Sequence, residues 1–347
     1  MKIRVREIDL LNLSSSDLAE VNTVIMESDS ASIFHTVEWN RILIEEFNLC
    51  YVALLATFDE KPVGLYIYFP LLDNTYQSPA INLQSVYGGP IAVMNNPDVI
   101  SELLLASEKK EQMAIFKVWT SPKIDPLPFV LAGYETREMY TPIMKLNGSQ
   151  DERWLRLKRD KRYKIRKAIK NGAVLVEAEV KDLPIYRELV SKTSAQFGME
   201  PFSLTFYNRL LEELVPIGNA KLFFIKVGEM IVSSTIILYC KDMVYGWELG
   251  WRREYTEFSP NDFLVWSIAQ NAYERGFKYF DLLRIEPDRL PGIAKWKESF
   301  RADIETCYFL QKKTFEYRLF HPLKTLFTNP RKVITKVQES LLNDGEK

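Results

Sequence analysis

Two charged residues stand at the end of a short apolar segment in the last third of the chain. Residues 279–283 are predicted to form a buried strand, with Asp281 inside it and Arg284 directly after it. Proteins of the α/β class tend to gather functional groups at such strand ends. An acid here can accept a proton from a nucleophile, and an arginine can stabilise developing negative charge. The alternative is that the two residues form an ion pair in the core.

A second acid lies in the strand predicted just before. Residues 243–251 alternate so that Glu248 shares one face with Gly246 and Gly250. A carboxylate between two glycines, in a strand otherwise rich in large side chains, leaves room for a ligand to approach the backbone. Glu248 is therefore a second candidate proton acceptor, with a satisfied core residue as the alternative.

Other reactive side chains are few. The chain of 347 residues has two histidines, His35 and His321, which argues against a His-rich metal site and against a Ser-His-Asp triad. Its three cysteines, Cys50, Cys240 and Cys307, show no CxxC spacing and fit free thiols in a reducing compartment. Transfer of an acyl group to an amine needs no covalent nucleophile, so it remains compatible with this inventory.

Composition predicts a globular chain with no global electrostatic attraction to a polyanion. Apolar residues make up 47%, charged residues 26%, and the formal net charge is −1. The N-terminus lacks the apolar run of a signal peptide, and no stretch approaches the roughly 20 apolar residues of a membrane helix. We therefore expect a cytoplasmic protein.

The elements that must position these residues are repeated along the chain. In each copy an aromatic residue precedes Asn-Arg and an apolar helix, and a hairpin, a Gly-containing strand, a capped helix and a closing strand follow. The repeats pair residues 34–47 with 202–214, 51–69 with 220–239, 86–92 with 243–251, 96–98 with 259–262, and 114–119 with 279–283. This pattern predicts one α/β unit that has been duplicated.

A very basic segment joins the two copies. Residues 153–170 hold ten Lys or Arg and one acid, and they end in Asn171-Gly172, which is typical of a helix C-terminus. A solvated helix is the plain interpretation, but the position between the copies favours a polyanion such as a nucleotide diphosphate, tRNA or anionic lipid. Its apolar residues share one helical face: Trp154, Leu157, Ile165 and Ala168.

The C-terminal tail is also basic. Residues 312–336 carry seven basic side chains against Glu316 alone, with aromatic and leucine side chains between them. The tail either contacts an anionic membrane peripherally or packs on the second domain with its charges outward, and packing is favoured.

Six motifs in order resemble the FemAB-like enzymes over roughly residues 30–305. These enzymes are duplicated GNAT-fold transferases related to the aminoacyltransferases that build peptidoglycan cross-bridges. The matching positions are Phe34, Thr36 and Trp39; Ala168 and Gly172; Asn261, Leu264 and Trp266; Asp281; and Gly292, Ile293, Trp296, Lys297 and Phe300.

The resemblance implies roles for individual residues. It places Lys297 near the transferred acyl group, and it gives the first domain a part in holding the acceptor. The residues expected to bind substrate are Thr36, Trp39, Arg41, Arg162, Lys164, Arg166, Asn261, Arg284 and Trp296. The basic ones on the connecting helix would attract the phosphates of the donor.

The chain departs from the family in the segment where GNAT enzymes cradle the pyrophosphate of acyl-CoA. Residues 252–261 contain no glycine, which disfavours close backbone approach to that group. The departure favours aminoacyl-tRNA, or another activated ester, as donor. No arginine occurs in residues 198–203, where a residue gripping the nucleotide of a cell-wall precursor would be expected.

The predicted architecture is an α/β (α+β) chain of two tandem GNAT-like (acyl-CoA N-acyltransferase-like) domains, each with a mixed, mostly antiparallel sheet flanked by helices. The expected bounds are 1–150 for the first domain, 151–310 for the second, and 311–347 for the basic tail.

The predicted activity is transfer of an acyl or aminoacyl group to an amine of a cell-envelope or glycan precursor. Asp281 or Glu248 would accept the amine proton, and Lys297, with Arg284 nearby, would stabilise the oxyanion. Neither a cofactor nor a metal is expected. Two alternatives remain: an acyl-CoA-dependent N-acyltransferase acting on a nucleotide sugar or polysaccharide precursor, and an inactive GNAT scaffold that binds nucleic acid or membrane.

Overall fold

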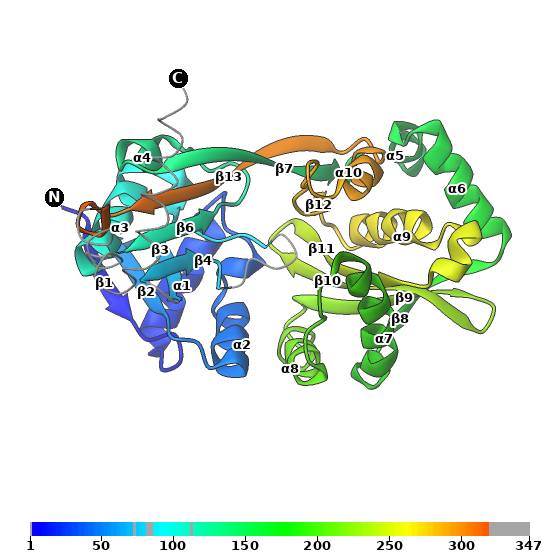
Figure 1. Ribbon diagram of the computed structural model, residues 1–347, viewed down its shortest axis with the longest axis horizontal. Coiled ribbons are helices and arrows are strands. Elements are labelled where there is room, and N and C mark those ends of the chain that lie inside the picture. Colours follow the sequence, from blue (N-terminus) through cyan, green and yellow to red (C-terminus); the bar gives the residue numbers. More distant parts are fainter. Residues whose placement is uncertain (1, 72–73, 81–85, 112–113, 319–347) are drawn as a thin grey trace, which may run out of the picture.

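A computed structural model describes residues 2–71, 74–80, 86–111 and 114–318 (Figure 1). The strands are β1 (Arg4–Ile8), β2 (Val52–Phe58), β3 (Lys61–Pro70), β4 (Thr75–Ser78), β5 (Ile91–Ala92), β6 (Ile115–Trp119), β7 (Glu135–Lys145), β8 (Ala173–Ala178), β9 (Ala220–Val227), β10 (Met230–Cys240), β11 (Met243–Trp251), β12 (Tyr279–Asp281) and β13 (Asp303–Lys313). The helices are α1 (Ser15–Glu27), α2 (Val37–Phe47), α3 (Pro97–Lys110), α4 (Leu127–Leu131), α5 (Gln150–Arg156), α6 (Arg159–Lys170), α7 (Leu183–Ser194), α8 (Leu204–Leu214), α9 (Pro260–Glu274) and α10 (Pro291–Glu298).

The strands form one continuous sheet in the order β1-β2-β3-β4-β6-β13-β7-β12-β11-β10-β9-β8, with β5 against β3. Strands β1 to β4 are antiparallel neighbours, and β4 then pairs with β6 in parallel. The second half repeats this arrangement, since β8 to β11 are antiparallel and β11 pairs with β12 in parallel. The predicted architecture of two GNAT-like units is confirmed.

The two halves exchange their last strands. After its parallel pair, the first sheet continues with β13 from the end of the chain, and the second continues with β7 from the first half. Strands β7 and β13 pair with each other from Asp303–Ile143 to Gln311–Glu135, and Figure 1 shows them running from one half to the other. The predicted domain bounds of 1–150 and 151–310 therefore describe chain segments that share one sheet.

Both hairpins carry the same bulge. In β3 the extra residue is Val63, because Thr57 faces Pro62 and Ala56 faces Gly64. In β10 it is Val232, the third residue of the strand as Val63 is of β3. A bulge is a specific local feature, so its recurrence at one position supports duplication more strongly than the shared strand count does.

The helices that follow the first aromatic motif of each half also begin alike. Thr36 caps α2 by accepting a hydrogen bond from the N–H of Trp39, and Ser203 caps α8 by accepting one from Phe206. Side-chain oxygens at these positions satisfy amide groups that the first helical turn leaves without partners. The sequence match of the two helices thus reflects a shared start signal.

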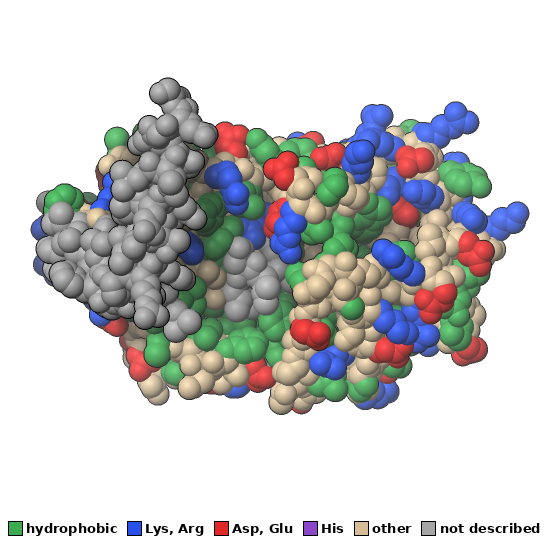
Figure 2. Space-filling view, viewed as in Figure 1, with side chains coloured by type: hydrophobic (Ala, Val, Ile, Leu, Met, Phe, Trp, Pro, Cys, Tyr) green, Lys and Arg blue, Asp and Glu red, His purple; other side chains and the backbone are tan. Residues whose placement is uncertain are grey.

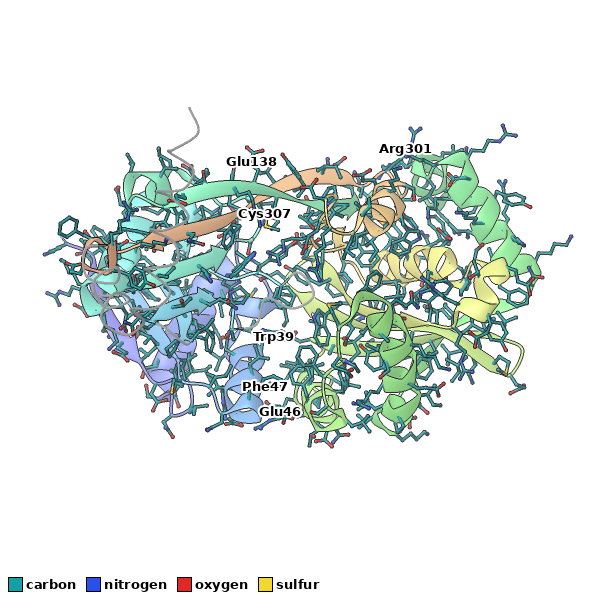
Figure 3. All side chains as sticks on the ribbon, in the orientation of Figure 1. Trp39, Glu46, Phe47, Glu138, Arg301 and Cys307 are labelled. Atoms are coloured by element: carbon teal, nitrogen blue, oxygen red, sulfur yellow. The ribbon has the colours of Figure 1, made fainter. Side chains whose placement is uncertain are left out.

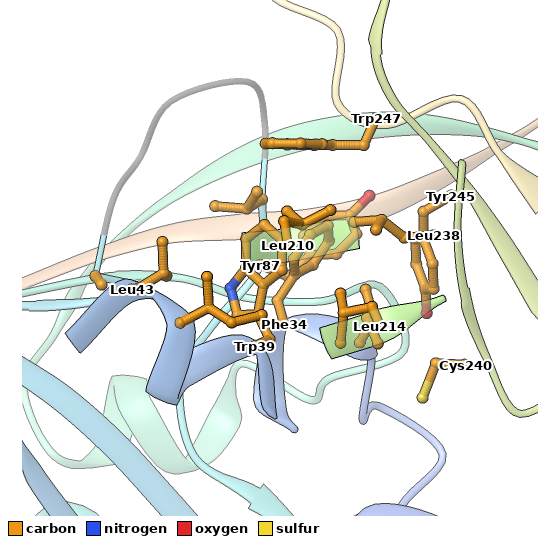
Figure 4. Packing of buried hydrophobic residues seen from close by; sticks show 14 of the residues in the cluster. Phe34, Trp39, Leu43, Tyr87, Leu210, Leu214, Leu238, Cys240, Tyr245 and Trp247 are labelled. Atoms are coloured by element: carbon orange, nitrogen blue, oxygen red, sulfur yellow. The ribbon is translucent and has the colours of Figure 1, made fainter. Parts of the chain in front are cut away.

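Apolar packing joins the halves. Figure 4 shows Phe34, Trp39 and Tyr87 of the first half against Tyr245 and Trp247 of the second. The ring centroids of Trp39 and Trp247 are 5.6 Å apart, and those of Phe34 and Tyr245 are 5.5 Å apart. Both pairs are edge to face, a favourable geometry for aromatic rings.

Polar contacts close the rim of this interface. Figure 3 shows Trp39, Glu46 and Phe47 along α2, next to the second half. Ser203 donates a hydrogen bond of 3.0 Å to Glu46, and Arg209 forms an ion pair with Glu45. The relative placement of the halves is therefore fixed by a buried core and by a polar edge.

Two predicted elements are wrong in extent. Of the predicted strand 86–92, only Ile91 and Ala92 are extended, because Gly89 has a φ of +93° and Pro90 has no N–H to donate. This short strand, β5, pairs with β3 at Gly64 and Leu65, and β4 pairs with the far end of β3. The closing strand predicted over 279–283 ends at Asp281.

The basic segment between the copies is not one helix. It is divided into α5 and α6, because Leu157 and Lys158 have extended ψ values of 145° and 151°. The side chain of Leu157 is buried at this break. The predicted C-terminus is confirmed, since Asn171 ends α6 and Gly172 has a φ of +77°.

No helix in the described part of the chain is long and apolar enough to cross a bilayer. Most of the predicted basic tail lies beyond residue 318 and so outside the described residues.

Candidate functional site

A cavity of about 720 Å³ opens in the second half of the molecule. Its walls come from β10, β11, the segment after β12, and helices α9 and α10. Figure 2 shows the hollowed surface between the halves and Lys and Arg side chains gathered over the end that holds α5 and α6. The charged and amide residues that line the cavity are Lys164, Gln196, Glu248, Arg253, Asn261, Asp262, Arg284, Glu286, Arg289 and Lys297.

The cavity exists because two strands diverge. Strand β11 pairs with β12 only from Met243–Tyr279 to Tyr245–Asp281. Beyond this point residues 246–251 have no partner strand on that side among the described strands. The separation leaves a row of backbone donors and acceptors facing the cavity.

Glu248 lies on a second bulge, this time in β11. Thr235 faces Leu249 and Ile236 faces Trp247, so Glu248 is the additional residue. Its φ is +46°, a conformation that costs energy for a residue with a Cβ and that recurs at functional sites. The prediction that Glu248 alternates regularly with Gly246 and Gly250 is therefore wrong, although Glu248 and Gly246 both line the cavity.

Two tyrosines hold the Glu248 carboxylate. The hydroxyl groups of Tyr186 on α7 and Tyr207 on α8 donate to its Oε2 at 2.9 and 2.6 Å. Glu248 is 8% exposed, so these bonds lie in a largely desolvated place. Donors at fixed positions orient a carboxylate for a single direction of approach by a ligand.

Lys297 reaches the cavity from the last turn of α10. Its Nζ donates to the backbone oxygens of Leu283 at 3.0 Å and Arg284 at 3.1 Å. Burial lowers the pKa of Lys297 to about 8, with the Arg284 charge acting in the same direction and Asp281 opposing it. An ammonium has three donors, so one N–H remains for a ligand.

Arg284 lines the cavity beside Lys297 and is 3% exposed. Burial is the main cause that lowers its pKa. Its Nη1 lies 3.8 Å from the sulfur of Met139, which belongs to β7 of the exchanged pair. The structure thus brings Glu248, Arg284 and Lys297 to one cavity, as the sequence predicts.

Asp281 is placed differently. Its side chain is fully buried, and it does not line the cavity. Its carboxylate accepts hydrogen bonds from Thr141 at 2.5 Å, Tyr87 at 2.8 Å and the N–H of Leu283 at 2.7 Å. Burial is the largest influence and raises the pKa of Asp281. Because Tyr87 and Thr141 belong to the first half, this carboxylate joins the halves, and its geometry does not support direct contact with a substrate amine.

The connecting helix contributes one residue to the cavity wall. Lys164 lines the cavity, whereas Arg162 and Arg166 do not. The guanidinium of Arg166 lies 5.3 Å from the centroid of the Trp154 ring. Of the three residues of the basic helix that are predicted to bind substrate, Lys164 is therefore the one placed to do so from the cavity wall.

The same helix carries a buried lysine that is not among the predicted site residues. Lys161 is 1% exposed and forms an ion pair with Asp262 at the start of α9. Asp262 also accepts a hydrogen bond of 3.2 Å from the indole N–H of Trp296. Lys161 precedes Ile165 by four residues on the apolar face, so helical spacing alone would have predicted its burial.

Two predicted substrate-binding residues of the second half do line the cavity. Asn261 accepts a hydrogen bond of 2.7 Å from the hydroxyl of Ser233, and Trp296 stands one position before Lys297. The predicted residues of the first half do not line it. Thr36 and Trp39 are buried in the interface between the halves, and Arg41 is exposed on α2.

The comparisons with known proteins agree with this geometry. Residues 156–298 match the family model of the acetyltransferase (GNAT) domain. The second half is a GNAT acyltransferase domain. No curated protein matches the chain in sequence. The matched segment contains the residues of the GNAT domain that line the cavity, from Lys164 to Lys297.

Solved structures extend the likeness to both halves. The crystal structure of FemX is similar with a TM-score of 0.71 and 12% identity, covering 92% of this chain and 99% of FemX. A domain of a putative lysylphosphatidylglycerol synthetase from Agrobacterium fabrum gives a TM-score of 0.56 and 13% identity over 90% and 96% of the two chains. A tandem GNAT protein from the clavulanic acid biosynthesis pathway gives 0.52 and 8% over 90% and 99%. The predicted resemblance to the duplicated, FemAB-like GNAT fold is confirmed.

Proposed function

We propose that the chain transfers an acyl or aminoacyl group from an activated ester donor, with aminoacyl-tRNA favoured, to an amine of a cell-envelope or glycan precursor. One observation carries the proposal: Glu248, Arg284 and Lys297, which come from three separate elements, meet in one cavity of the GNAT domain. A carboxylate and two cations around one space provide the groups that aminolysis of an ester requires.

In this reaction the amine nitrogen bonds to the carbonyl carbon of the donor, and the bond from that carbon to the leaving oxygen then breaks. Glu248 accepts the proton that the nitrogen loses, directly or through a water, and the proton passes to the leaving oxygen. The remaining N–H of Lys297 donates to the carbonyl oxygen as its negative charge develops, and Arg284 adds positive charge. Asp281 acts at a distance, by holding the segment whose carbonyl groups bind Lys297.

The mouth of the cavity supports a donor that carries phosphate. Lys164 and Arg253 line it beside the N-terminus of α9. Backbone N–H groups at a helix N-terminus carry partial positive charge, which the two side chains reinforce. A tRNA acceptor end and the pyrophosphate of acyl-CoA both present the matching charge.

One observation favours acyl-CoA as the second candidate donor. Residues 246–251 of β11 continue past the end of the β11–β12 pairing, and an extended arm that contains amide groups can bind along a strand in such a place. Against it, the turn before α9 has no glycine and forms a 3-10 helix at Arg253–Phe258. Glycine-free backbone cannot close around a pyrophosphate, so we retain aminoacyl-tRNA as the favoured donor.

The envelope acceptor and the cellular location belong to the same proposal. A putative lysylphosphatidylglycerol synthetase shares this fold, which shows that the fold is compatible with a lipid product. We place the chain in the cytoplasm, and the basic tail is the segment that would make any peripheral contact with the inner face of the membrane.

The experiment compares Lys297→Ala with Lys295→Ala, a matched control on the exposed face of the same helix. Labelled aminoacyl-tRNA and labelled acetyl-CoA are offered with amine-bearing nucleotide-linked peptides or aminolipids, and amide formation is measured. We expect Lys297→Ala to lower kcat by about 100-fold or more with little change in donor affinity. Unchanged turnover in Lys297→Ala, with an active wild type, would refute the role of this lysine.

A further inference from the structure

The inner end of the cavity differs in chemistry from its mouth. Six apolar side chains from β10, α9 and the end of β12 line this part of the cavity, and each is 5% exposed or less. They belong to the hydrophobic core of the second half, so the cavity extends into that core. These residues are Ile237, Leu264, Val265, Ile268, Phe280 and Leu282.

A glycine borders this end and packs against Phe280. Gly246 faces Ile237 across the β10–β11 ladder, and a Cβ placed on Gly246 would lie 3.2 Å from the Phe280 ring. Its φ is not positive, so backbone conformation does not require glycine at this position. The absence of a side chain at Gly246 therefore leaves room for the Phe280 ring, at the point where the strand borders the cavity.

The volume exceeds what a small acyl group needs. At about 30 Å³ per heavy atom, the share of a water molecule in the liquid, 720 Å³ corresponds to about 24 heavy atoms. A glycyl or alanyl group has only four or five. Even if the polar mouth holds part of the acceptor and of the donor's leaving group, the apolar end has room for a hydrocarbon chain.

The polarity of the walls changes along the cavity. The charged residues Lys297, Arg284 and Glu248 line the same cavity as the six apolar residues, which carry no polar side-chain atom. A carbonyl carbon placed at Lys297 would thus direct the rest of its acyl group toward Ile268 and Phe280. Apolar surface in such a place is stabilised by contact with another apolar group.

We propose that the inner end of the cavity binds the hydrocarbon part of the transferred acyl group, so that the donor carries a large apolar acyl or aminoacyl group. This inference rests on the proposed function and names the substrate class of the same site. A fatty acyl chain and a large apolar amino-acid side chain present the same chemistry to these walls, and the experiment separates them.

The binding test uses sodium alkanoates from butanoate to decanoate as probes, with titration calorimetry on the full chain. Burial of one methylene contributes about 0.8 kcal/mol, or about fourfold in affinity. We expect decanoate to bind at least tenfold tighter than butanoate. Ile268→Phe, which narrows the inner end, should weaken decanoate binding at least tenfold and leave butanoate within twofold.

Val265→Phe on the neighbouring turn serves as an independent second variant, and circular dichroism verifies that both variants fold. Ile217→Phe, at an exposed position that is 52% accessible, is the matched control and should change nothing. Equal affinity of wild type for butanoate and decanoate would overturn the inference. So would equal losses for both probes in Ile268→Phe.

The transfer arm compares decanoyl-CoA with acetyl-CoA and leucyl-tRNA with glycyl-tRNA. Preference for decanoyl-CoA identifies a fatty acyl group, and preference for leucyl-tRNA identifies an apolar aminoacyl group. If probe binding depends on chain length but no donor acylates an amine, the proposed function fails and the apolar site stands. If acetyl or glycyl donors react as fast as the larger ones, the function stands and this inference fails.

Discussion

The buried ion pair of Lys161 and Asp262 is the most informative place to perturb the GNAT domain. It connects the basic helix α6 to the start of α9, and through Trp296 it connects both to α10, which carries Lys297. Burial is the largest influence on Lys161 and lowers its pKa, so the folded protein holds this charge against its desolvation cost. The carboxylate of Asp262 is the largest influence that offsets this cost, and the Phe300 ring lies 4.5 Å from the ammonium.

Removing one partner of such a pair leaves the other charge buried. Measured costs of this kind are about 3–5 kcal/mol. Because Asp262 is 7% exposed, water can relieve part of its penalty, and we expect Lys161→Met to lower the free energy of unfolding by about 3 kcal/mol. Asp262→Asn keeps an oxygen for Trp296, so the double variant removes both charges and should cost about 1 kcal/mol.

The assay is urea unfolding at constant ionic strength, followed by far-UV circular dichroism. Lys167→Met, at an exposed position two residues after Ile165 on the same helix, is the control for helix propensity. We expect the double variant to lose less free energy of unfolding than the two single variants summed, which is the signature of coupling in a double-mutant cycle. If Lys161→Met costs no more than Lys167→Met, or if the two substitutions simply add, the pair does not stabilise this junction and the reasoning is refuted.

Two further predictions concern the site itself. Because the pKa of Lys297 is lowered to about 8 and the ammonium form is the one that stabilises the oxyanion, kcat should fall as pH rises through about 8, and Lys297→Arg should abolish this falling limb of the pH–rate profile. Asp281→Ala leaves three buried donors without an acceptor, at about 1 kcal/mol or more each, so thermal unfolding should show a loss of about 3 kcal/mol or more. Asp281→Asn should retain kcat within tenfold because Asp281 does not line the cavity, whereas a loss above 100-fold would make it the proton acceptor instead of Glu248.

The sequence predicts local elements well where a single physical signal dominates. The hairpins of both halves, the capped helix starts and the Asn171-Gly172 helix end all follow from short-range turn and capping chemistry. The strand predicted over residues 86–92 is mostly not formed. A strand is predicted there because the segment follows the first hairpin as residues 243–251 follow the second, but Gly89 and Pro90 interrupt the backbone.

Arrangement in space is harder to predict because it depends on pairing between distant residues. Nothing in the β13 sequence indicates that it joins the sheet of the first half, since strand register is decided by long-range packing. The same applies to Asp281. The sequence predicts an acid at a strand end, but its partners Tyr87 and Thr141 lie 194 and 140 residues away along the chain.

The duplicated fold has a cavity in its second half, and the register of the hairpins explains why the first half lacks the same space at this point. Counted from the turn past the shared bulge, Tyr66 and Tyr68 of β3 correspond to Thr235 and Ile237 of β10. Thr235 and Ile237 line the cavity. Their tyrosine counterparts are buried side by side, with ring centroids 5.0 Å apart.

In the first half the rings of Tyr66 and Tyr68 thus fill the space that, in the second half, is a cavity bordered by Thr235 and Ile237. A buried aromatic side chain contributes more apolar area than either replacement, so the first half gains a filled core where the second leaves a cavity. The difference follows from the packing of two strand positions, which fill the core of one copy and border a cavity in the other. On this argument, opening the first half would take at least the replacement of both tyrosines, and would weaken the core cluster that β3 shares with α3 and β6.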